Sequence, residues 1–399
     1  MPLYPANIIA QAATPVQKLQ NASRMGLRST AVSATPPTIS TLGPNGSNQQ
    51  QATGIASGVL CTAQTYMAQT ATWPLLATTG GGIPFYQSNM GGVDTVGIDT
   101  IGFWTDAQVV EICNRRDEYW QVLVNNELIS ATKTTMPTGS AYGLTRLVLT
   151  FASRLRRKFI CFGQSSGYNG IGIGPQDTIE TLDWAKELSF GVMSDSYGGS
   201  DGGTFVGGPF FYAAFRLQCG KYCCSTGGGS GYDTNGTGGE NFNSRLAEVL
   251  ASNPDVMLFS GGINDATFAN AGTVFAAARS GSSRVIVVTA PWTPANASRS
   301  AGSAKRDTIY AALSAIAGPW IFVDNIAGTW ISKRADGTLT TKSSGAAPWQ
   351  TGNGYVGATT SAGNGDFYVS DGVHPSQPAG VRYLGELLAS SIAAAAEYL

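Results

Sequence analysis

Residues 188–199 read LSFGVMSDSYGG, a short apolar run followed at once by polar residues and glycines. An apolar run of this length that ends in turn residues predicts a buried β-strand over 188–193. Runs of the same kind occupy 255–259, 284–288 and 320–323. The chain therefore carries a series of short buried strands after about residue 186.

Helical patterns lie between and after these strands. One has a single apolar face made of Phe242, Leu246, Val249 and Leu250. Another covers 307–316, and a long one follows Pro378 and closes the chain. The alternation predicts an α/β domain over 186–399, with a parallel sheet flanked by helices on both sides. Ligands bind such sheets at the carboxyl ends of the strands.

Upstream, the pattern changes to short apolar or alternating runs. Four of them predict strands, over 108–113, 119–124, 147–151 and 158–162. Turn residues separate these runs, which predicts an antiparallel β-sandwich domain over 81–180. Residues 1–80 are rich in Ala, Thr, Ser, Gln and Asn, and this composition predicts an attachment region or linker.

The overall composition excludes several kinds of partner. The 399 residues carry a net charge of −1 and only 12% are charged, so no basic field attracts nucleic acid. No stretch approaches the roughly 20 apolar residues of a membrane span. Residues 1–7 lack the features of a signal peptide, so we expect either a signal removed upstream or another export route. The polar, turn-rich composition favours an extracellular or virion-associated protein, with homo-oligomer formation and virion attachment left open.

The six cysteines are too sparse for a disulfide scaffold in a chain of this length. Cys219, Cys223 and Cys224 are close in sequence, but no second Cys or His pair completes a tetrahedral zinc site. We expect buried thiols or one disulfide. The sequence gives no indication of a metal or an organic cofactor.

Two motifs suggest nucleophilic chemistry. Ser196 follows the first strand directly, where its hydroxyl meets a ligand but needs a base to attack a carbonyl. His374, the only histidine in the chain, is the one histidine candidate for that base. Asp371, three residues earlier, can fix the tautomer of the imidazole. The ordinary alternatives are a surface turn at Asp195-Ser196 and a structural histidine.

Two further motifs can supply hydrogen-bond donors. Asn264, in the Gly-Gly-Ile-Asn-Asp stretch after the second strand run, has an amide that can donate to an oxyanion. Its alternative role is a helix N-cap, by Asn264 or Asp265. The glycines of 227–232 let the backbone N–H approach a ligand closely, and the alternative is a flexible loop.

In this order, Asp195-Ser196, the glycine-rich turn, Gly262-x-Asn264-Asp265 and Asp371-x-x-His374 strongly resemble the SGNH (GDSL-type) hydrolase family. The resemblance covers about 186–399 and implies that family's flavodoxin-like sheet. It is carried by the joint pattern, since each motif is ambiguous alone.

The resemblance implies a role for each matching position. Ser196 is the nucleophile, His374 the general base and Asp371 the acid that orients it. The oxyanion hole is formed by the N–H groups of Ser196 and Gly228 and by the Asn264 side chain, with Gly229 as the alternative to Gly228. Asp195 and Asp265 support the loops.

Two positions depart from the family pattern. The family's Gly before Asp-Ser is Ser194 here, which we expect to alter the backbone of the turn. The usual Leu or Ile after the nucleophile is Tyr197, which we expect to narrow or redirect the pocket.

The resemblance implies ester hydrolysis through an acyl-enzyme, without a cofactor. A strand-rich domain beside an SGNH domain resembles carbohydrate acetylesterases, and the polar N-terminal segment resembles bacteriophage tail or spike proteins. The predicted substrate is therefore an O-acetylated polysaccharide or a small ester. The predicted sandwich either binds glycan or only packs. The alternatives are a secreted lipase or thioesterase, and a non-catalytic glycan-binding adhesin.

Overall fold

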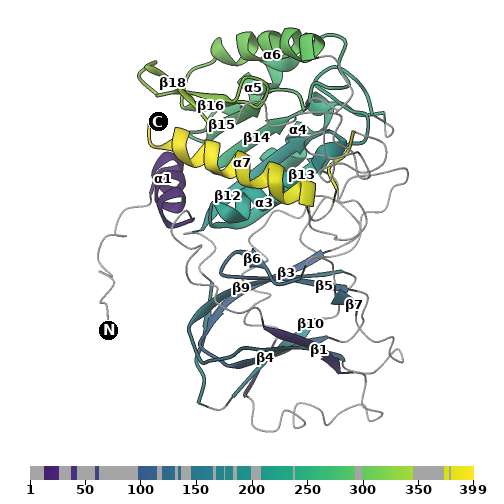
Figure 1. Ribbon diagram of the computed structural model, residues 1–399, viewed down its shortest axis with the longest axis vertical. Coiled ribbons are helices and arrows are strands. Elements are labelled where there is room, and N and C mark those ends of the chain that lie inside the picture. Colours follow the sequence, from purple (N-terminus) through teal and green to yellow (C-terminus); the bar gives the residue numbers. More distant parts are fainter. Residues whose placement is uncertain are drawn as a thin grey trace, which may run out of the picture.

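The computed structural model describes residues 13–26, 37–42, 59–62, 98–114, 119–130, 134–135, 145–164, 168–174, 176–182, 187–198, 208–236, 239–292, 299–344, 373–376 and 379–399. Two antiparallel sheets lie in the first half of the chain, and one larger sheet with helices lies in the second (Figure 1). No described helix combines the length and the apolar character that crossing a membrane requires.

The sheet of the second half has seven strands in the order β13-β12-β14-β15-β16-β17-β18. They are β12 (Leu188–Ser194), β13 (Cys219–Thr226), β14 (Val256–Ser260), β15 (Val285–Thr289), β16 (Trp320–Asp324), β17 (Thr329–Lys333) and β18 (Leu339–Ser343). From β13 to β16 all neighbours are parallel. In chain order these strands read 2-1-3-4-5, the order of flavodoxin-like sheets.

The prediction of an entirely parallel sheet is wrong at one edge. β17 and β18 are antiparallel to their neighbours, so the sheet is mixed. The connections 325–328 and 334–338 are too short for a crossover, and short connections can join only antiparallel strands.

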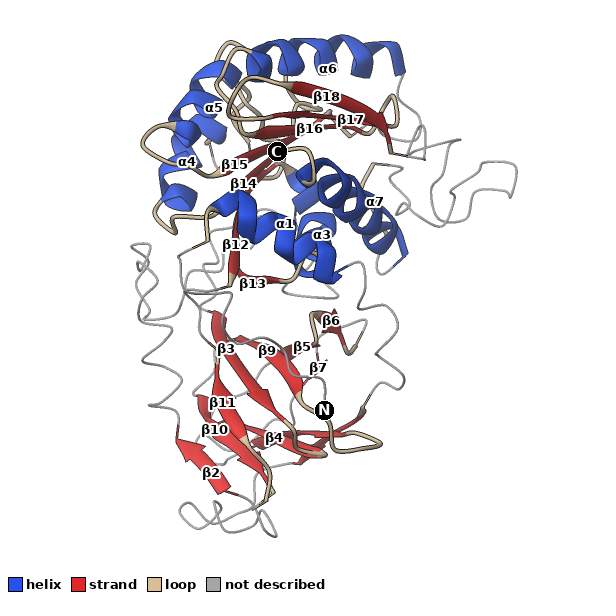
Figure 2. Ribbon diagram, turned by 90° about the vertical axis from the view of Figure 1, so that its left-hand side faces the viewer, coloured by secondary structure: helices blue, strands red, loops and turns tan. Residues whose placement is uncertain are grey.

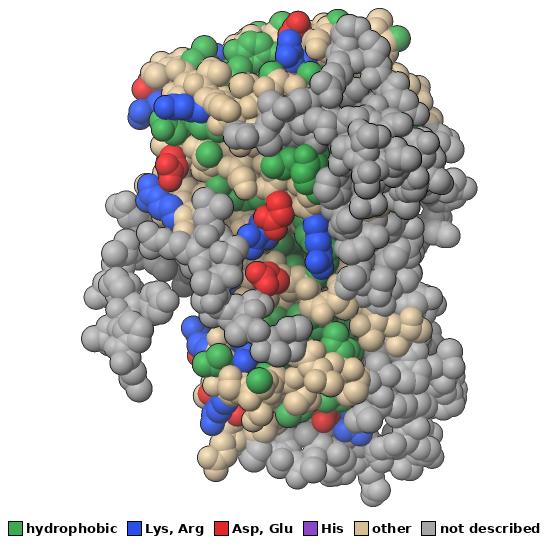
Figure 3. Space-filling view, viewed as in Figure 1, with side chains coloured by type: hydrophobic (Ala, Val, Ile, Leu, Met, Phe, Trp, Pro, Cys, Tyr) green, Lys and Arg blue, Asp and Glu red, His purple; other side chains and the backbone are tan. Residues whose placement is uncertain are grey.

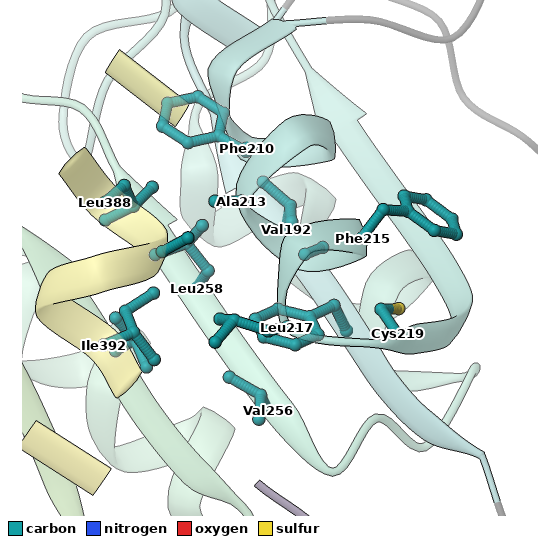
Figure 4. Close-up of a cluster of buried hydrophobic side chains, with 14 of the residues drawn as sticks. Val192, Phe210, Ala213, Phe215, Leu217, Cys219, Val256, Leu258, Leu388 and Ile392 are labelled. Atoms are coloured by element: carbon teal, nitrogen blue, oxygen red, sulfur yellow. The ribbon is translucent and has the colours of Figure 1, made fainter. Parts of the chain in front are cut away.

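Helices cover both faces of this sheet (Figure 2). One face carries α1 (Pro15–Gly26), α3 (Gly208–Arg216) and α7 (Ala379–Ala396), and the other carries α4 (Phe242–Leu250), α5 (Ala271–Arg279) and α6 (Arg299–Ser314). Successive side chains of a strand point to opposite faces. Accordingly, Val192 and Leu258 belong to the core under α3 and α7, whereas Met193 and Phe259 belong to the core under α4 and α5 (Figure 4 shows the first).

The helical predictions hold with one adjustment. The face predicted over 242–250 is α4, with Phe242, Leu246 and Val249 buried. The pattern over 307–316 is the second half of α6, which begins eight residues earlier, at Arg299. The segment after Pro378 is α7.

The first half contains two antiparallel sheets. One has the order β1-β8-β4-β10-β2, and the other has the order β11-β3-β9-β5-β6, with β7 also paired to β5. The first comprises β1 (Thr38–Leu42), β2 (Val59–Thr62), β4 (Val109–Asn114), β8 (Thr145–Thr150) and β10 (Tyr168–Ile173). The second comprises β3 (Ile98–Thr105), β5 (Tyr119–Val124), β6 (Glu127–Leu128), β7 (Thr134–Thr135), β9 (Arg157–Gln164) and β11 (Ile179–Thr181). The four predicted strands are β4, β5, β8 and β9.

The six-stranded sheet is buried on both faces. Trp120, Val122 and Phe159 face a core shared with the five-stranded sheet. Their neighbours Leu123 and Ile160 instead join the buried cluster under α3 and α7. This sheet is therefore a middle layer between the outer sheet and the α/β body (Figures 1 and 2).

Polar contacts connect the six-stranded middle sheet to the α/β body. Asn125 and Asn126 connect β5 to β6 with φ angles of 51° and 67°, the left-handed values of a tight hairpin turn. The amide of Asn126 donates to Gln218, directly before β13. The ammonium of Lys158, on β9, pairs with Glu187, directly before β12.

Part of the segment expected to be an attachment region or linker is instead a docked helix. In α1, Leu19 is fully buried among residues of the core under α7. Lys18 Nζ lies 3.1 Å from Asp255 Oδ2, and Gln20 Nε2 donates to the carbonyl of Ala396 at 2.9 Å. Elsewhere in 1–80, the described residues include β1 and β2 of the outer sheet.

We expect Leu123→Ala to lower the free energy of unfolding by about 2–5 kcal/mol, because it removes buried side-chain volume between the middle sheet and the α/β body. Leu155→Ala is the matched control. Leu155 is 55% exposed, and its substitution should change stability by less than about 0.5 kcal/mol. Urea unfolding of both variants measures the difference. Equal stabilities, or separate unfolding of two units with only one affected, would contradict the packing role of Leu123.

Candidate active site

Ser196 lies at the carboxyl end of β12, in a short 3-10 turn over Ser196–Gly198. The two preceding residues, Ser194 and Asp195, are fully buried, whereas Ser196 is half-buried. The Asp195 N–H donates to the carbonyl of Ser260 at the end of β14, at 3.3 Å. Because β12 lies between β13 and β14, this is the point where the strand order reverses and where ligands bind in open α/β sheets.

His374 reaches Ser196 across 178 residues of sequence. Its Nε2 lies 2.9 Å from Ser196 Oγ, within range for transfer of the hydroxyl proton to a neutral imidazole. Asp371, the predicted partner of the imidazole, lies outside the described residues.

Tyr197, which we expected to narrow or redirect the pocket, has its side chain in the core. Its side chain is fully buried, and its ring centre lies 5.9 Å from that of His374. The Tyr197 ring also stacks on Trp292, with 6.0 Å between ring centres and 13° between planes. The Trp292 indole N–H is fixed by Ser260 Oγ at 2.7 Å. Tyr197 therefore supports the imidazole from the core side.

Ser194, where the family pattern has glycine, is the last residue of β12. It remains a regular strand residue, paired with Thr226 of β13 and Ser260 of β14. Its hydroxyl donates to the carbonyl of Asp195 at 2.8 Å, so this buried polar group is satisfied locally.

The glycine-rich stretch folds back onto the strand that carries Ser196. The Gly227 N–H donates to the carbonyl of Ser194 at 3.1 Å, and the Ser230 N–H donates to that of Gly227 at 3.1 Å. Gly228 is half-buried in this turn, and Gly229 is exposed with φ of 70°. The stretch is thus a defined turn beside Ser196.

Asn264 is not a helix N-cap, because the next helix begins seven residues later, at Ala271. It lies in the loop after β14, where Gly262 takes a φ of 103° that favours glycine. Its Nδ2 donates to the carbonyl of Ser230 at 2.9 Å. The loops carrying Gly228 and Asn264 are therefore bonded to each other.

Asp265 fixes the same pair of loops. Its carboxylate accepts the backbone N–H groups of Tyr232, Asp233 and Thr234, each at 2.9 Å. A Cβ at Gly231 would lie 2.1 Å from Asp265 Oδ2, so only glycine leaves room for this carboxylate. The supporting role expected for Asp265 agrees with these contacts.

Asp195 is a buried carboxyl directly before Ser196. Burial raises its pKa to about 7, and the nearby charge of Asp265 acts in the same direction. The N–H of Tyr197, which donates to Asp195 Oδ1 at 3.0 Å, and the charge of Arg245 oppose this rise in pKa. Asp195 therefore titrates near neutral pH without being exposed.

Sequence reasoning missed one buried charge close to the site. Arg245, on α4, is only 5% exposed and donates to Ser225, Ser194 and Ser230. Its position three residues after Phe242 places it on the apolar face of the helix, and a lone charge on such a face was the available signal.

Cys161, Cys219, Cys223 and Cys224 are free and buried. Burial raises the pKa of Cys223 and of Cys224 to about 12, so neither is a ready thiolate nucleophile. Within the described part of the chain, no three His, Cys, Asp or Glu residues group as metal ligands.

We expect the stability of the protein to fall as pH rises from about 4 to about 7. The pKa of Asp195 is about 7 in the folded state, against 3.8 for an ordinary Asp in the unfolded state. Between these values the unfolded state releases the proton more readily, so the contribution of Asp195 to stability is complete below pH 3.8 and is lost as pH rises to about 7. Asp195→Asn keeps an acceptor for the Tyr197 N–H but cannot ionise, so its stability should fall less over this range.

Asp307→Asn is the control, because its side chain is 69% exposed and it should keep the wild-type pH dependence. Urea unfolding at pH 5, 6, 7 and 8 measures the three proteins. Identical slopes for wild type and Asp195→Asn would show that Asp195 does not titrate in this window.

No protein-family model matches the sequence, and the search of curated proteins finds no match. Among solved structures, an active-site mutant of a family two carbohydrate esterase from Clostridium thermocellum is similar, at 12% identity over 74% of this chain and 90% of that one, with a TM-score of 0.40. A putative GDSL-like lipase from Bacteroides ovatus matches at 12% identity over 60% and 77%, with a TM-score of 0.37. A salicylyl-acyltransferase from a tetracycline biosynthetic pathway matches at 12% identity over 74% and 82%, with a TM-score of 0.40. Identities and scores this low assign no activity to the chain.

Proposed function

We propose that this protein is a serine esterase of the SGNH type that removes O-acetyl groups from a polysaccharide. The observation that carries the proposal is the 2.9 Å contact between Ser196 Oγ and His374 Nε2 at the carboxyl ends of buried parallel strands. A serine hydroxyl becomes an effective nucleophile only when a base takes its proton, and this contact supplies the base.

In the proposed reaction, Ser196 Oγ attacks the ester carbonyl carbon while His374 Nε2 takes the hydroxyl proton. The tetrahedral intermediate collapses, the bond to the sugar oxygen breaks, and His374 returns the proton to the leaving hydroxyl. Water then attacks the acetyl-enzyme with His374 as base, and acetate leaves as Ser196 regains its proton. Asp371 is proposed to orient the imidazole.

The proposed oxyanion donors are the backbone N–H groups of Ser196 and Gly228 and the side-chain amide of Asn264. One amide N–H of Asn264 is held by the Ser230 carbonyl at 2.9 Å, which fixes the plane of the amide. Its second N–H can then donate to a developing oxyanion. Each such preorganised donor contributes about 3 kcal/mol to the transition state in comparable sites.

A short acyl group suits the described surroundings of Ser196. A long acyl chain would need an apolar groove, but the aromatic side chains beside the site, Tyr197, Trp292 and Phe210, are all fully buried. The large apolar side chains exposed in the described residues are Val109, Leu155, Leu339 and Tyr398. None of these belongs to the loops that carry Ser196, Asn264 or His374.

A neutral glycan is consistent with the distribution of charge. On the face drawn in Figure 3, the described acidic and basic side chains lie in small mixed groups. Arg216, for example, lies between two acidic residues: its Nη1 is 3.6 Å from Glu127 Oε1, and its Nε is 2.9 Å from Glu386 Oε1.

We further propose that the two antiparallel sheets form a β-sandwich domain and that the protein acts outside cells or on a virion.

We expect Ser196→Ala to lower kcat/KM on p-nitrophenyl acetate by at least about a thousandfold, because it removes the proposed nucleophile. His374→Ala should lose a similar amount, and the double variant should be no slower than either single variant, since the two groups act as a unit.

Ser314→Ala makes the same chemical change on α6, away from the site, and should keep wild-type activity. Steady-state rates of the four variants provide the measurement. A Ser196→Ala turnover within about tenfold of wild type would rule out Ser196 as nucleophile.

We expect kcat/KM to be highest for acetyl and to fall by at least about tenfold for octanoyl among p-nitrophenyl esters, because the exposed large apolar side chains of the described residues lie outside the loops that carry Ser196, Asn264 and His374. Acetate release from O-acetylated polysaccharides, with Ser196→Ala as the blank, tests the polymeric substrate directly. A preference for octanoyl would favour a lipase instead, and absence of any Ser196-dependent release would favour a non-catalytic glycan binder.

A further inference from the structure

Arg245 is a buried cation that the proposed reaction does not use. It lies on α4 and is 5% exposed, between the apolar residues Phe242 and Val249 of the same helix face. A buried guanidinium is stable only where its N–H groups find acceptors. The acceptors that it finds therefore indicate which parts of the fold it serves.

Its acceptors lie on three separate segments that meet at the site. Nη1 donates to Ser225 Oγ, at the end of β13, at 2.9 Å. Nη2 donates to the carbonyl of Ser194, at the end of β12, at 3.3 Å, and to Ser230 Oγ, in the glycine-rich turn, at 2.8 Å. The two terminal guanidinium nitrogens thus join both strand ends to the turn, whereas Nε finds no hydrogen-bond partner among the described residues.

Each of these segments holds a part of the proposed machinery. Ser194 lies two residues before the nucleophile Ser196, and Ser230 lies two residues after Gly228. The carbonyl of Ser230 also accepts the amide of Asn264 at 2.9 Å. Arg245 therefore donates a hydrogen bond directly to β12, the strand that carries the nucleophile. It is linked to the proposed oxyanion donor Asn264 through Ser230, which bonds to both residues.

The local sequence leaves space for a guanidinium fork. A Cβ at Gly227 would lie 3.0 Å from Arg245 Nη2 and 2.8 Å from Ser230 Oγ, so a side chain at 227 would crowd this contact. The planar guanidinium also donates to acceptors on two sides at fixed angles. A lysine ammonium is a compact charge on a flexible chain and cannot hold both sets of acceptors in this geometry.

We infer that Arg245 is a positioning residue that sets the distance between the nucleophile Ser196 and the oxyanion donors Gly228 and Asn264. The inference rests on the proposed esterase function. Arg245 itself does not touch the substrate, so its loss acts on the geometry of the transition state and leaves ground-state binding in place.

The test compares Arg245→Lys with Arg284→Lys. Arg284 is a matched control, because it is 6% exposed and donates to the carbonyl of Ala278 and to Asn253, at the opposite end of the sheet. We expect Arg245→Lys to lower kcat on p-nitrophenyl acetate by about 100-fold with KM within about threefold of wild type. Arg284→Lys should keep both kcat and KM within about threefold.

Ser230→Ala gives an independent readout if Arg245→Lys does not fold. It keeps the carbonyl that holds Asn264 and removes the hydroxyl, which accepts from Arg245 and donates to the carbonyl of Gly227, each at 2.8 Å. We expect a loss of about tenfold in kcat. In the double variant Arg245→Lys/Ser230→Ala the losses should be less than additive, because the two changes share the Arg245–Ser230 contact.

The outcomes separate the two proposals. Full activity in Ser230→Ala, additive losses in the double variant, or equal effects of Arg245→Lys and Arg284→Lys would overturn the role of Arg245. Absence of Ser196-dependent hydrolysis in the wild type would instead overturn the proposed function, whatever the Arg245 variants do.

Discussion

The parallel pairing of β12 with β13 on one side and β14 on the other holds three strand ends at one level of the sheet. Ser194 pairs with both Thr226 and Ser260, so the chain leaves all three strands at the same edge. The turns that follow can then bond to each other directly, as the Gly227 N–H does to Ser194. A slip of one residue would turn every side chain of β12 to the opposite face, so the two apolar cores on either side also protect the geometry of the site.

Buried polar groups behind this edge add order at a cost in stability. Asp265 and Arg245 each bind several segments, and their hydrogen bonds offset the loss of hydration on burial. Compensation is incomplete at both Asp195 and Arg245, because Asp195 Oδ2 and Arg245 Nε find no hydrogen-bond partner among the described residues. Buried polar atoms without hydrogen-bond partners are common at functional sites, where the required geometry is kept at a cost in stability.

The elements that sequence alone predicted are those whose burial leaves a continuous apolar run. The strand predicted over 119–124 has the same bounds in the structure, because the middle sheet is covered on both faces. β10 was missed because its sequence, YNGIGI, mixes glycines with polar residues, and α3 because GPFFYAAFR is short and apolar on most sides. The pairing of Ser196 with His374 was predicted from a resemblance in motif order, since no local pattern joins residues so far apart. Arg245 was missed because the apolar periodicity of 242–250 identifies the buried face of the helix without showing that one charged residue lies on it.

The position of the middle sheet limits how the N-terminal strands could contact the proposed polymeric substrate. Its two faces are already occupied, by the outer sheet through residues such as Val122 and by the α/β body through Leu123 and Ile160. A glycan cannot bind on either face without unpacking the core. The remaining places on these strands are the sheet edges, the connecting loops and the far face of the outer sheet. That far face carries the ion pair of Arg146 with Glu111, with a nitrogen–oxygen distance of 3.1 Å, but these side chains are only 8% and 13% exposed. The packing role of the N-terminal strands is thus built into the fold, and any glycan contact must come in addition to it.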